Sequence, residues 1–361
     1  MSKALPGCLA WLAGLLLVAG LALAETPDDT AGEADGEAAE ITAAPAAPGA
    51  PATAAADPIA AKHQFGFVAR PSEGSPGVYG GYTKGCLSGA AMLPIDGPNW
   101  QVMRLSRNRN WAHPHLVDLL QRLTMDLRSK DDWPGLLIGD MSQPRGGPML
   151  TGHKSHQTGL DADIWYKPMP AKQLSWQERE VLEPLLLAEH NGTAVIAENW
   201  SPGFVKLLRR AASYPEVERI LVHPAVKKAL CDATPAAGRA WLQKIRPTFL
   251  HNYHFHLRIG CPADSTGCVA QKPTVPGDGC GKPLEDWLKL VSRPPKPAPK
   301  PDPTKPKKPP VKPRVVTLAD LPKHCSTVLL MDNPDMARPA APVVGKVPVP
   351  YPPAAVELAQ P

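Results

Sequence analysis

Two short segments of this chain contain the side chains that hydrolytic metal enzymes use. The first begins at His153 and places His156 and Asp163 seven residues apart, with a glycine between them that lets the backbone turn. The second lies about ninety residues later and contains His254 and His256, which point to the same side if that segment is a strand. Catalytic zinc sites take three nitrogen or oxygen ligands from the protein and leave the fourth position to water. The two segments together therefore predict a zinc site of this kind.

The stretch from His251 to His256 also has an ordinary explanation. A single histidine on a strand is usually a satisfied polar side chain, and a lone His-x-His pair is weak evidence for a ligand. Three histidines within six residues, in a chain that contains 11, are harder to attribute to chance. His153 stays open among three roles: a further metal ligand, a substrate contact or a loop residue. Asp161 and Asp163 are not both expected to bind metal.

Alternating side chains predict two strands that position these groups. A strand at 160–165 buries one apolar face and aims both carboxylates at the other, and a strand at 251–259 places its site histidines on one face. Other patterns predict helices at 114–129, 175–189, 225–231, 241–249 and from Ser201, and strands at 135–139 and 217–222. This mixture indicates an α+β fold with a central antiparallel sheet and flanking helices, in which the polar faces of two strands meet at the metal.

The first residues predict export. Lys3 precedes an apolar run from Leu9 to Leu23, and Ala24 ends a small-residue cleavage pattern, so residues 1–24 are expected to be a signal peptide. The run of about fifteen residues is short for a membrane span, and an uncleaved anchor is the alternative. Without Cys8 the mature chain keeps six cysteines. In an exported protein these favour disulfides over thiolate metal sites.

Composition divides the remaining chain. Residues 25–61 contain eight acids and no lysine or arginine and cannot build a core. The lysines that alternate with prolines after Arg293 suggest an extended spacer. The expected divisions are a signal peptide at 1–24, a disordered acidic Ala/Pro-rich linker at 25–61, one folded domain at 62–292, a Pro/Lys-rich spacer at 293–320, a C-terminal segment at 321–332 and a disordered tail at 333–361.

The net charge of +5 comes largely from the lysines of that spacer. These lysines either attract an acidic polymer such as the peptides of a cell-wall glycan, or keep the spacer extended in solvent. Interleaved aromatics and nucleic-acid-binding motifs are missing from the sequence, so nucleic acid is not an expected partner.

Several motifs along the chain match the pattern of a known family. They are Gly85-Cys-Leu-Ser-Gly-Ala90, Leu93-Pro-Ile95, Gln101-Val-Met-Arg104, Leu137-Ile-Gly-Asp-Met141, Gly152-His-Lys-Ser-His-Gln-Thr-Gly-Leu-Asp161, His254-Phe-His256, Cys261-Pro-Ala-Asp-Ser265 and Gly277-Asp-Gly-Cys-Gly281. The metal motifs resemble the zinc peptidase group that includes lysostaphin-type peptidases, D-alanyl-D-alanine carboxypeptidases and the hedgehog signalling domain. The full set is most similar to the penicillin-insensitive murein endopeptidase family, over a stretch from about Gly85 to Cys325.

The resemblance implies one zinc ion and assigns its ligands. His156, Asp163 and His256 would bind the metal, and His153 is close enough to be an additional ligand in some states. His254 would be the general base or acid that handles protons, with orientation of the site as its alternative role.

The same resemblance implies further details. Asp161 falls beside the ligands or at the surface, and Tyr253 stands where carboxypeptidase relatives have a glutamate. Asn191 and Ala194 stand where some members have an aspartate and a histidine that bind a second zinc, so a second metal is not expected. The implied disulfides, one of fifteen possible connectivities, are Cys86 with Cys325, Cys231 with Cys280 and Cys261 with Cys268.

The function implied is that of a periplasmic zinc metalloendopeptidase. Its substrate would be the D-alanyl to meso-diaminopimelyl amide that cross-links the peptide stems of peptidoglycan, and penicillin would not inhibit it because no serine is acylated. One alternative is a D-alanyl-D-alanine carboxypeptidase or dipeptidase, against which Tyr253 argues. Another is a non-catalytic zinc module that binds peptidoglycan. No membrane span is expected after cleavage of the signal.

Overall fold

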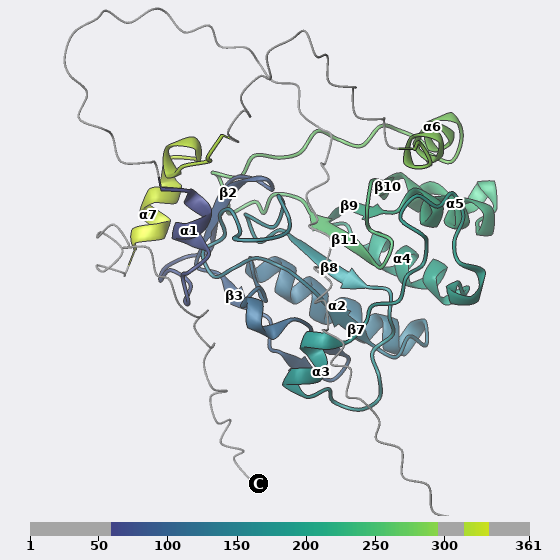
Figure 1. The fold of residues 1–361 in the computed structure, drawn as a ribbon, viewed down its shortest axis with the longest axis horizontal. Helices are drawn as coiled ribbons and strands as arrows, with labels where there is room; N and C mark the ends of the chain where they lie inside the picture. Colours follow the sequence, from purple (N-terminus) through teal and green to yellow (C-terminus); the bar gives the residue numbers. More distant parts are fainter. Residues whose placement is uncertain (1–58, 295–313, 332–361) are drawn as a thin grey trace, which may run out of the picture.

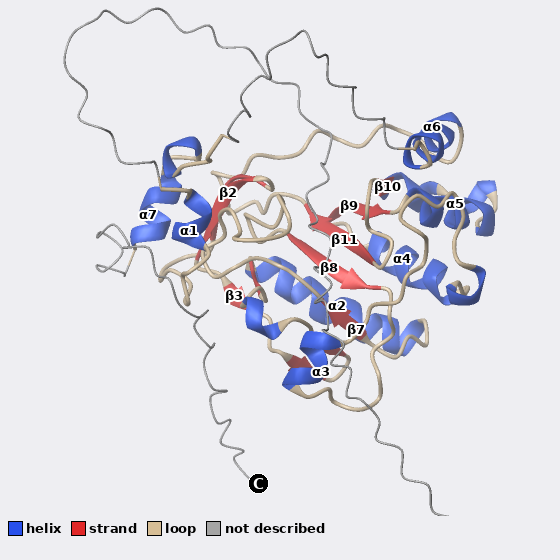
Figure 2. Ribbon diagram, in the orientation of Figure 1, coloured by secondary structure: helices blue, strands red, loops and turns tan. Residues whose placement is uncertain are grey.

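A seven-stranded sheet organises the molecule, with its strands in the order β10-β9-β11-β8-β7-β5-β4 (Figure 1). The computed structural model describes residues 59–294 and 314–331. The sheet strands, in chain order, are β4 (Asp96–Gly97), β5 (Trp100–Val102), β7 (Leu136–Ile138), β8 (Asp161–Trp165), β9 (Val217–Val222), β10 (Ile245–Pro247) and β11 (His254–Ile259). Helices pack around the sheet (Figure 2), and the coarse prediction of an α+β fold is confirmed.

The remaining elements are helices and two small sheets. The helices are α1 (Ala61–Phe65), α2 (Pro114–Lys130), α3 (Trp176–Val181), α4 (Gly203–Ser213), α5 (Pro224–Ala233), α6 (Lys282–Val291) and α7 (His324–Leu330). Two small antiparallel sheets pair β1 (Gly77–Gly81) with β2 (Lys84–Ser88) and β3 (Ala91–Met92) with β6 (Trp111–Ala112). The predicted signal peptide, most of the linker, most of the spacer and the predicted tail lie outside the described residues.

The central sheet is mixed, which corrects the prediction of an antiparallel one. In its middle, the pairs β9–β11, β11–β8 and β8–β7 are antiparallel. The pairs β10–β9 and β5–β7 are parallel. The chain passes through α5 between β9 and β10 and through α2 between β5 and β7. A helical crossover returns the chain in the same direction, which makes the next strand parallel.

Strands β8 and β11 are buried on both faces, but the two faces differ in chemistry. The apolar face, which includes Ile164 and Leu257, belongs to the main hydrophobic cluster together with leucines of α2 and α4. The opposite face has the polar side chains, with His256 paired across from Asp163 and Arg258 across from Asp161. Directly opposed residues share a face of an antiparallel pair, so the strand alternation predicted from sequence brings these four groups together.

Two histidines outside the metal motifs begin helices. His113 is the N-cap of α2 and His223 is the N-cap of α5, and each is followed by a proline at the first helical position. The ring Nδ1 of each accepts a hydrogen bond from the backbone N–H two residues later, at 3.3 Å and 3.2 Å respectively. Such a cap satisfies an otherwise unpaired helix N–H, which accounts for both side chains structurally.

Three disulfides tie distant segments together. Cys86 is bonded to Cys325, Cys231 to Cys280 and Cys261 to Cys268, the same pairs that the family resemblance implied. The first has a sequence separation of 239 and attaches α7 to β2. Residues of α1 and α7 join it in a second hydrophobic cluster, and these helices lie side by side in Figure 1. Among the described residues, no helix is long and apolar enough to cross a membrane.

Candidate metal centre

The loop before β8 delivers two histidines to the polar face of the sheet. His156 adopts a φ of 64°, a left-handed conformation that is uncommon outside glycine and that turns its ring toward β8 and β11. Gln157 fixes the loop, because its side-chain nitrogen donates to the carbonyls of Thr83 and Lys154 at 2.8 Å and its oxygen accepts from the N–H of Gly85 at 3.3 Å. The loop is therefore held in place before any ligand binds.

Asp163 lies at the centre of the site and faces four histidines. Its Oδ2 is 3.3 Å from His153 Nε2 and 3.4 Å from His156 Nε2. Its Oδ1 is 3.0 Å from His256 Nδ1 and 3.6 Å from His254 Nε2. The side chain of His153 is 17% exposed, whereas the other four side chains are exposed by 5% or less. The cluster is thus buried, with His153 nearer to solvent.

Asp161 contacts the imidazoles of His156 and His256 at the nitrogens that do not face Asp163. Its Oδ1 lies 3.1 Å from His156 Nδ1, and its Oδ2 lies 2.9 Å from His256 Nε2. Ser155 Oγ donates to the same Oδ2 at 2.5 Å, and Arg258 Nη2 lies 3.2 Å from it. Each ring therefore presents one nitrogen to Asp161 and the other to Asp163.

This arrangement fits a metal ion on the Asp163 side. A neutral imidazole that donates one N–H to Asp161 has a lone pair on its other nitrogen. Those lone pairs, on His156 Nε2 and His256 Nδ1, face oxygens of Asp163, which is repulsive unless a ring proton or a metal cation lies between each nitrogen and the carboxylate. Within the described part of the chain, His156 Nε2 and Asp163 Oδ1 are buried and have no hydrogen-bond partner. His153, His156 and Asp163 also offer ligand atoms that all lie within 4.8 Å of one another.

A second grouping, of His156, Asp161 and His256, also brings ligand atoms within 4.8 Å of one another. The guanidinium of Arg258 lies 3.2 Å from both Asp161 Oδ2 and His256 Nε2. A fixed positive charge at this distance opposes a cation there. The donor set around Asp163 is therefore the better candidate for a metal site. Asp161 instead orients the imidazoles of His156 and His256.

The carboxylates also control the charges of the cluster. Burial alone lowers the pKa of His156, but Asp161 and Asp163 outweigh it and raise that pKa well above its usual value. Burial likewise opposes ionisation of Asp163, yet the surrounding histidines hold its pKa well below the usual range. Protons on the histidines and a metal cation would compensate the same negative charge, so metal binding should displace protons.

His254 differs from the predicted ligands. Burial is the largest influence on it and lowers its pKa to about 4, so the ring is neutral at neutral pH. Neither of its nitrogens has a hydrogen-bond partner among the described residues. Its unused lone pair, beside the metal donors, can accept a hydrogen bond from a bound water, but a pKa this low makes the ring a weak base at neutral pH.

His251 also joins the site, although sequence reasoning gave it no role beyond membership of the histidine-rich stretch. Its ring centroid lies 4.8 Å from that of His254 and 5.9 Å from that of His256. Its Nδ1 donates to the carbonyl of Phe249 at 2.7 Å, which leaves Nε2 as the acceptor nitrogen. The density of histidines in this stretch was the signal that could have identified it.

Asp140 is a second residue that sequence reasoning missed. Its Oδ2 accepts from Arg109 Nη1 at 2.6 Å and from Arg107 Nη1 at 3.0 Å, and lies 3.4 Å from His153 Nε2. Burial opposes its charge, but these cations, Arg109 most strongly, lower its pKa. His153 therefore lies between two carboxylates, Asp140 and Asp163. Only the family motif around residues 137–141 pointed to this position.

Comparison with known proteins connects this geometry to a family. Residues 78–330 match the family model described as penicillin-insensitive murein endopeptidase. The chain belongs to this family. A penicillin-insensitive murein endopeptidase from Yersinia enterocolitica is 41% identical over 251 residues, which cover 69% of this chain and 88% of the relative. One from Klebsiella pneumoniae is 42% identical over 256 residues, covering 70% and 89%. One from Haemophilus influenzae is 42% identical over 228 residues, covering 63% and 77%.

The matched region includes the whole candidate metal centre of this murein endopeptidase family member, from Asp140 on one side to Arg258 on the other. It also includes all six cysteines that form the disulfides. The site and the cross-links that support it thus lie within the part of the chain that defines the family.

Proposed function

We propose that this chain is a zinc-dependent murein endopeptidase that hydrolyses the D-alanyl to meso-diaminopimelyl amide between peptide stems of peptidoglycan. Family membership makes it a peptidase that acts on peptidoglycan. The observation that supports zinc is the pair of imidazole nitrogens, His156 Nε2 and His256 Nδ1, that face the oxygens of Asp163 at 3.4 Å and 3.0 Å. Nitrogen and carboxylate oxygen donors of this kind are the usual protein ligands of catalytic zinc.

His156, Asp163 and His256 are the proposed ligands. His153, which also faces Asp163, is the candidate for an additional ligand or a neighbouring contact. When bound in such a site, zinc supplies Lewis acidity that activates water and polarises the scissile carbonyl. The protein therefore needs no serine nucleophile, which agrees with insensitivity to penicillin.

His254 is proposed to move the proton. Its neutral ring lies on the same strand face as His256, within reach of a water or an amide that occupies the site. It would accept the proton of the attacking water and then return it to the leaving amine. His251, whose Nε2 is left as the acceptor nitrogen by the bond from Nδ1 to Phe249, would accept a hydrogen bond from a water bound beside His254.

Asp161, Ser155 and Arg258 are proposed to orient the ligands. The carboxylate of Asp161 fixes which nitrogen of His156 and of His256 carries the proton. Ser155 and Arg258 hold that carboxylate in place. Outer partners of this kind raise ligand basicity and keep the ring planes aligned before the metal binds. The site of action is proposed to be the periplasm, on the basis of the signal peptide expected at residues 1–24.

Digestion of purified cross-linked peptidoglycan by the chain from residue 25 onward tests the proposal. The expected products are monomeric stem peptides from dimers, detected by mass spectrometry, with activity abolished by a chelator, restored by zinc and unchanged by penicillin. The variant His256→Ala should be inactive, and His63→Ala, which changes an exposed histidine, should behave as wild type.

Two results would contradict the proposal. Release of free D-alanine would identify a carboxypeptidase. A zinc-loaded, folded sample that yields no product would indicate a binding module.

A further inference from the structure

Arg107 differs from the other arginines around the metal centre. Arg109 is buried and its guanidinium bonds to Asp140 and Thr151, and Arg258 is buried against Ser155 and Asp161. Arg104 donates to the backbone carbonyls of residues 179, 180 and 182. The side chain of Arg107 is 45% exposed and makes one ion pair, from Nη1 to Asp140. Among the described residues, its Nε and Nη2 have no hydrogen-bond partner.

The guanidinium of Arg107 lies at the solvent side of the metal centre. Asp140 Oδ2 is shared between Arg107 Nη1 at 3.0 Å and His153 Nε2 at 3.4 Å. His153 Nε2 in turn lies 3.3 Å from Asp163 Oδ2. Because His153 is more exposed than the rings around it, substrate should approach on this side. Arg107 therefore contacts Asp140, and Asp140 contacts His153, whose ring faces the proposed metal site. The unused donors of Arg107 lie beside this site.

The backbone under Arg107 is fixed in an unusual shape. The single turn η1 (Leu105–Arg107) is flanked by Arg104 at φ 55°, ψ 50° and by Asn108 at φ 51°, ψ 46°. Left-handed conformations at two such residues persist only where the surroundings enforce them, and they are frequent at functional sites. The turn is anchored by Glu180, whose two carboxylate oxygens accept from Ser106 N and Oγ, each at 2.8 Å.

The proposed substrate contains a group that suits these donors. The scissile amide nitrogen belongs to the D-centre of meso-diaminopimelate, and the carbon that bears this nitrogen also bears a carboxylate. A guanidinium binds a carboxylate through two parallel N–H donors, a charge-assisted geometry that lysine or glutamine does not reproduce. We infer that Arg107 is a specificity-determining residue that binds the α-carboxylate on the amine side of the scissile amide.

This inference rests on the proposed function. A pair of substrates tests the role of Arg107 separately from the endopeptidase activity. One is a cross-linked dimer with a free carboxylate at the D-centre, and the other is the same dimer amidated at that carboxylate. Wild type should cleave the free form at least about tenfold better, as expected for the loss of one charge-assisted contact. Arg107→Gln should lower kcat/KM on the free form by about 10–100-fold, mainly through KM, and change the amidated form little.

Controls exclude a general disturbance of the site. Arg107→Gln should keep the zinc content and melting temperature of wild type, since the proposed ligands are untouched. Arg107→Lys should recover part of the lost activity through its charge. Arg128→Gln, which alters an exposed arginine of α2, should match wild type on both dimers.

The possible results distinguish the role of Arg107 from the endopeptidase function. An equal loss on both dimers in Arg107→Gln would overturn the role of Arg107 while leaving the endopeptidase intact. Absence of cleavage of either dimer by zinc-loaded wild type would overturn both. Release of terminal D-alanine that depends on Arg107 would keep the recognition of an α-carboxylate and assign it to a carboxypeptidase instead.

Discussion

Two regions of this molecule bury ionisable groups, and they differ in how completely the hydrogen bonds of those groups are satisfied. Lys227 is fully buried, and its Nζ donates to the carbonyl of Leu242 at 2.8 Å and to that of Asp278 at 2.6 Å. At the metal centre, by contrast, His156 Nε2, Asp163 Oδ1 and both ring nitrogens of His254 have no hydrogen-bond partner among the described residues. Buried polar groups are normally paired. These unpaired atoms gather in one cluster, where we propose that a metal ion binds.

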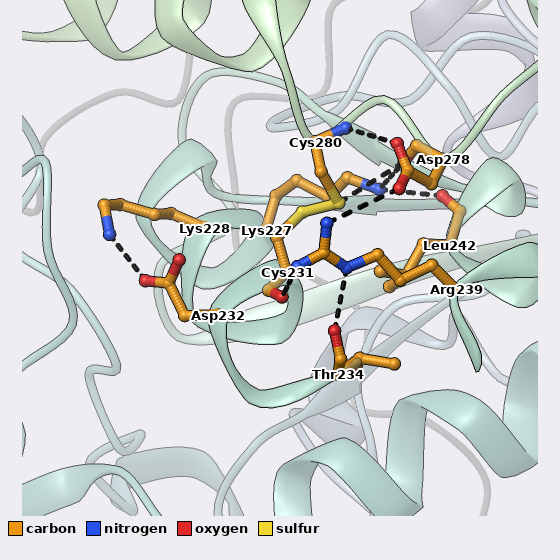
Figure 3. Close-up of a disulfide and its surroundings, with 9 residues drawn as sticks. All are labelled: Lys227, Lys228, Cys231, Asp232, Thr234, Arg239, Leu242, Asp278 and Cys280. Atoms are coloured by element: carbon orange, nitrogen blue, oxygen red, sulfur yellow. Dashed lines mark hydrogen bonds and ion pairs between the residues drawn. A yellow bond between two sulfur atoms is a disulfide. The ribbon is translucent and has the colours of Figure 1, made fainter. Parts of the chain in front are cut away.

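The segments around Lys227 are held together by a disulfide and by hydrogen bonds and ion pairs (Figure 3). One helical turn after Lys227, Cys231 is bonded to Cys280, which holds the loop that contains Asp278 against α5. Arg239 donates to the carbonyls of Cys231 and Thr234. Burial lowers the pKa of Lys227 to about 7. A neutral amine has two N–H groups, and the two carbonyls account for both, so this region needs no ligand.

The largest expected effect comes from removing the central acid of the unpaired region. Asp163→Asn removes a proposed ligand and the negative charge that the two proposed histidine ligands face. Loss of an outer partner of a ligand already costs about 10–100-fold in metal affinity, so zinc affinity should fall by more than about 100-fold. Hydrolysis of cross-linked peptidoglycan should disappear with the metal. Zinc titration against a competing chelator measures the affinity. Asp118→Asn, at an exposed carboxylate of α2, is the matched control, and similar behaviour of the two variants would refute the ligand role.

Asp161→Asn should have a smaller effect on metal but a clear effect on stability. Zinc affinity should fall by about 10–100-fold, because the tautomers of His156 and His256 are no longer fixed. The metal-free protein should lose about 3–5 kcal/mol of unfolding free energy, because His156, His256 and Arg258 all lose a buried charged partner. Denaturant unfolding of the metal-free protein gives this value. Unchanged stability would show that Asp161 is not the counter-charge of Arg258.

Lys227→Met tests the satisfied region through pH. The pKa of Lys227 is lowered from 10.5 to about 7, so between these values the unfolded chain binds more protons than the folded chain. Folding stability therefore rises with pH across this window, by an amount on the order of a few kcal/mol. The variant should lose this rise, and Lys228→Met, at an exposed neighbour, should keep it. Parallel pH profiles for wild type and Lys227→Met would contradict a lowered pKa.

Sequence alone predicted the parts of the fold that depend on local pattern. The alternation along residues 160–165 and 251–259 placed the polar groups on one face, which the strand pairing bears out. The directions of the outer strands were not predictable, because they depend on where α2 and α5 return the chain to the sheet. The helix expected over 175–189 begins at its capping box but ends at Val181, since Pro184 lacks the N–H that a longer helix needs.

The candidate site was predictable only in the part that depends on local residue spacing. Spacing singled out the histidines, and the family resemblance separated Asp163 from Asp161, to which the structure adds the contact between Arg258 and Asp161. The position of Asp140 beside His153 depends likewise on a contact between a strand end and a distant loop. Such long-range contacts have no signature in residue spacing, so only the structure could show them.

The central claim is that a metal ion lies on the Asp163 side of the two imidazoles. A crystal structure of the zinc-loaded protein, with anomalous difference maps recorded on both sides of the zinc absorption edge, tests it most directly. We expect one peak bonded to His156 Nε2, His256 Nδ1 and Asp163, with Asp161 still bonded to the opposite nitrogens of the two rings. A peak bonded to Asp161, or zinc bound only elsewhere in a folded protein, would contradict it.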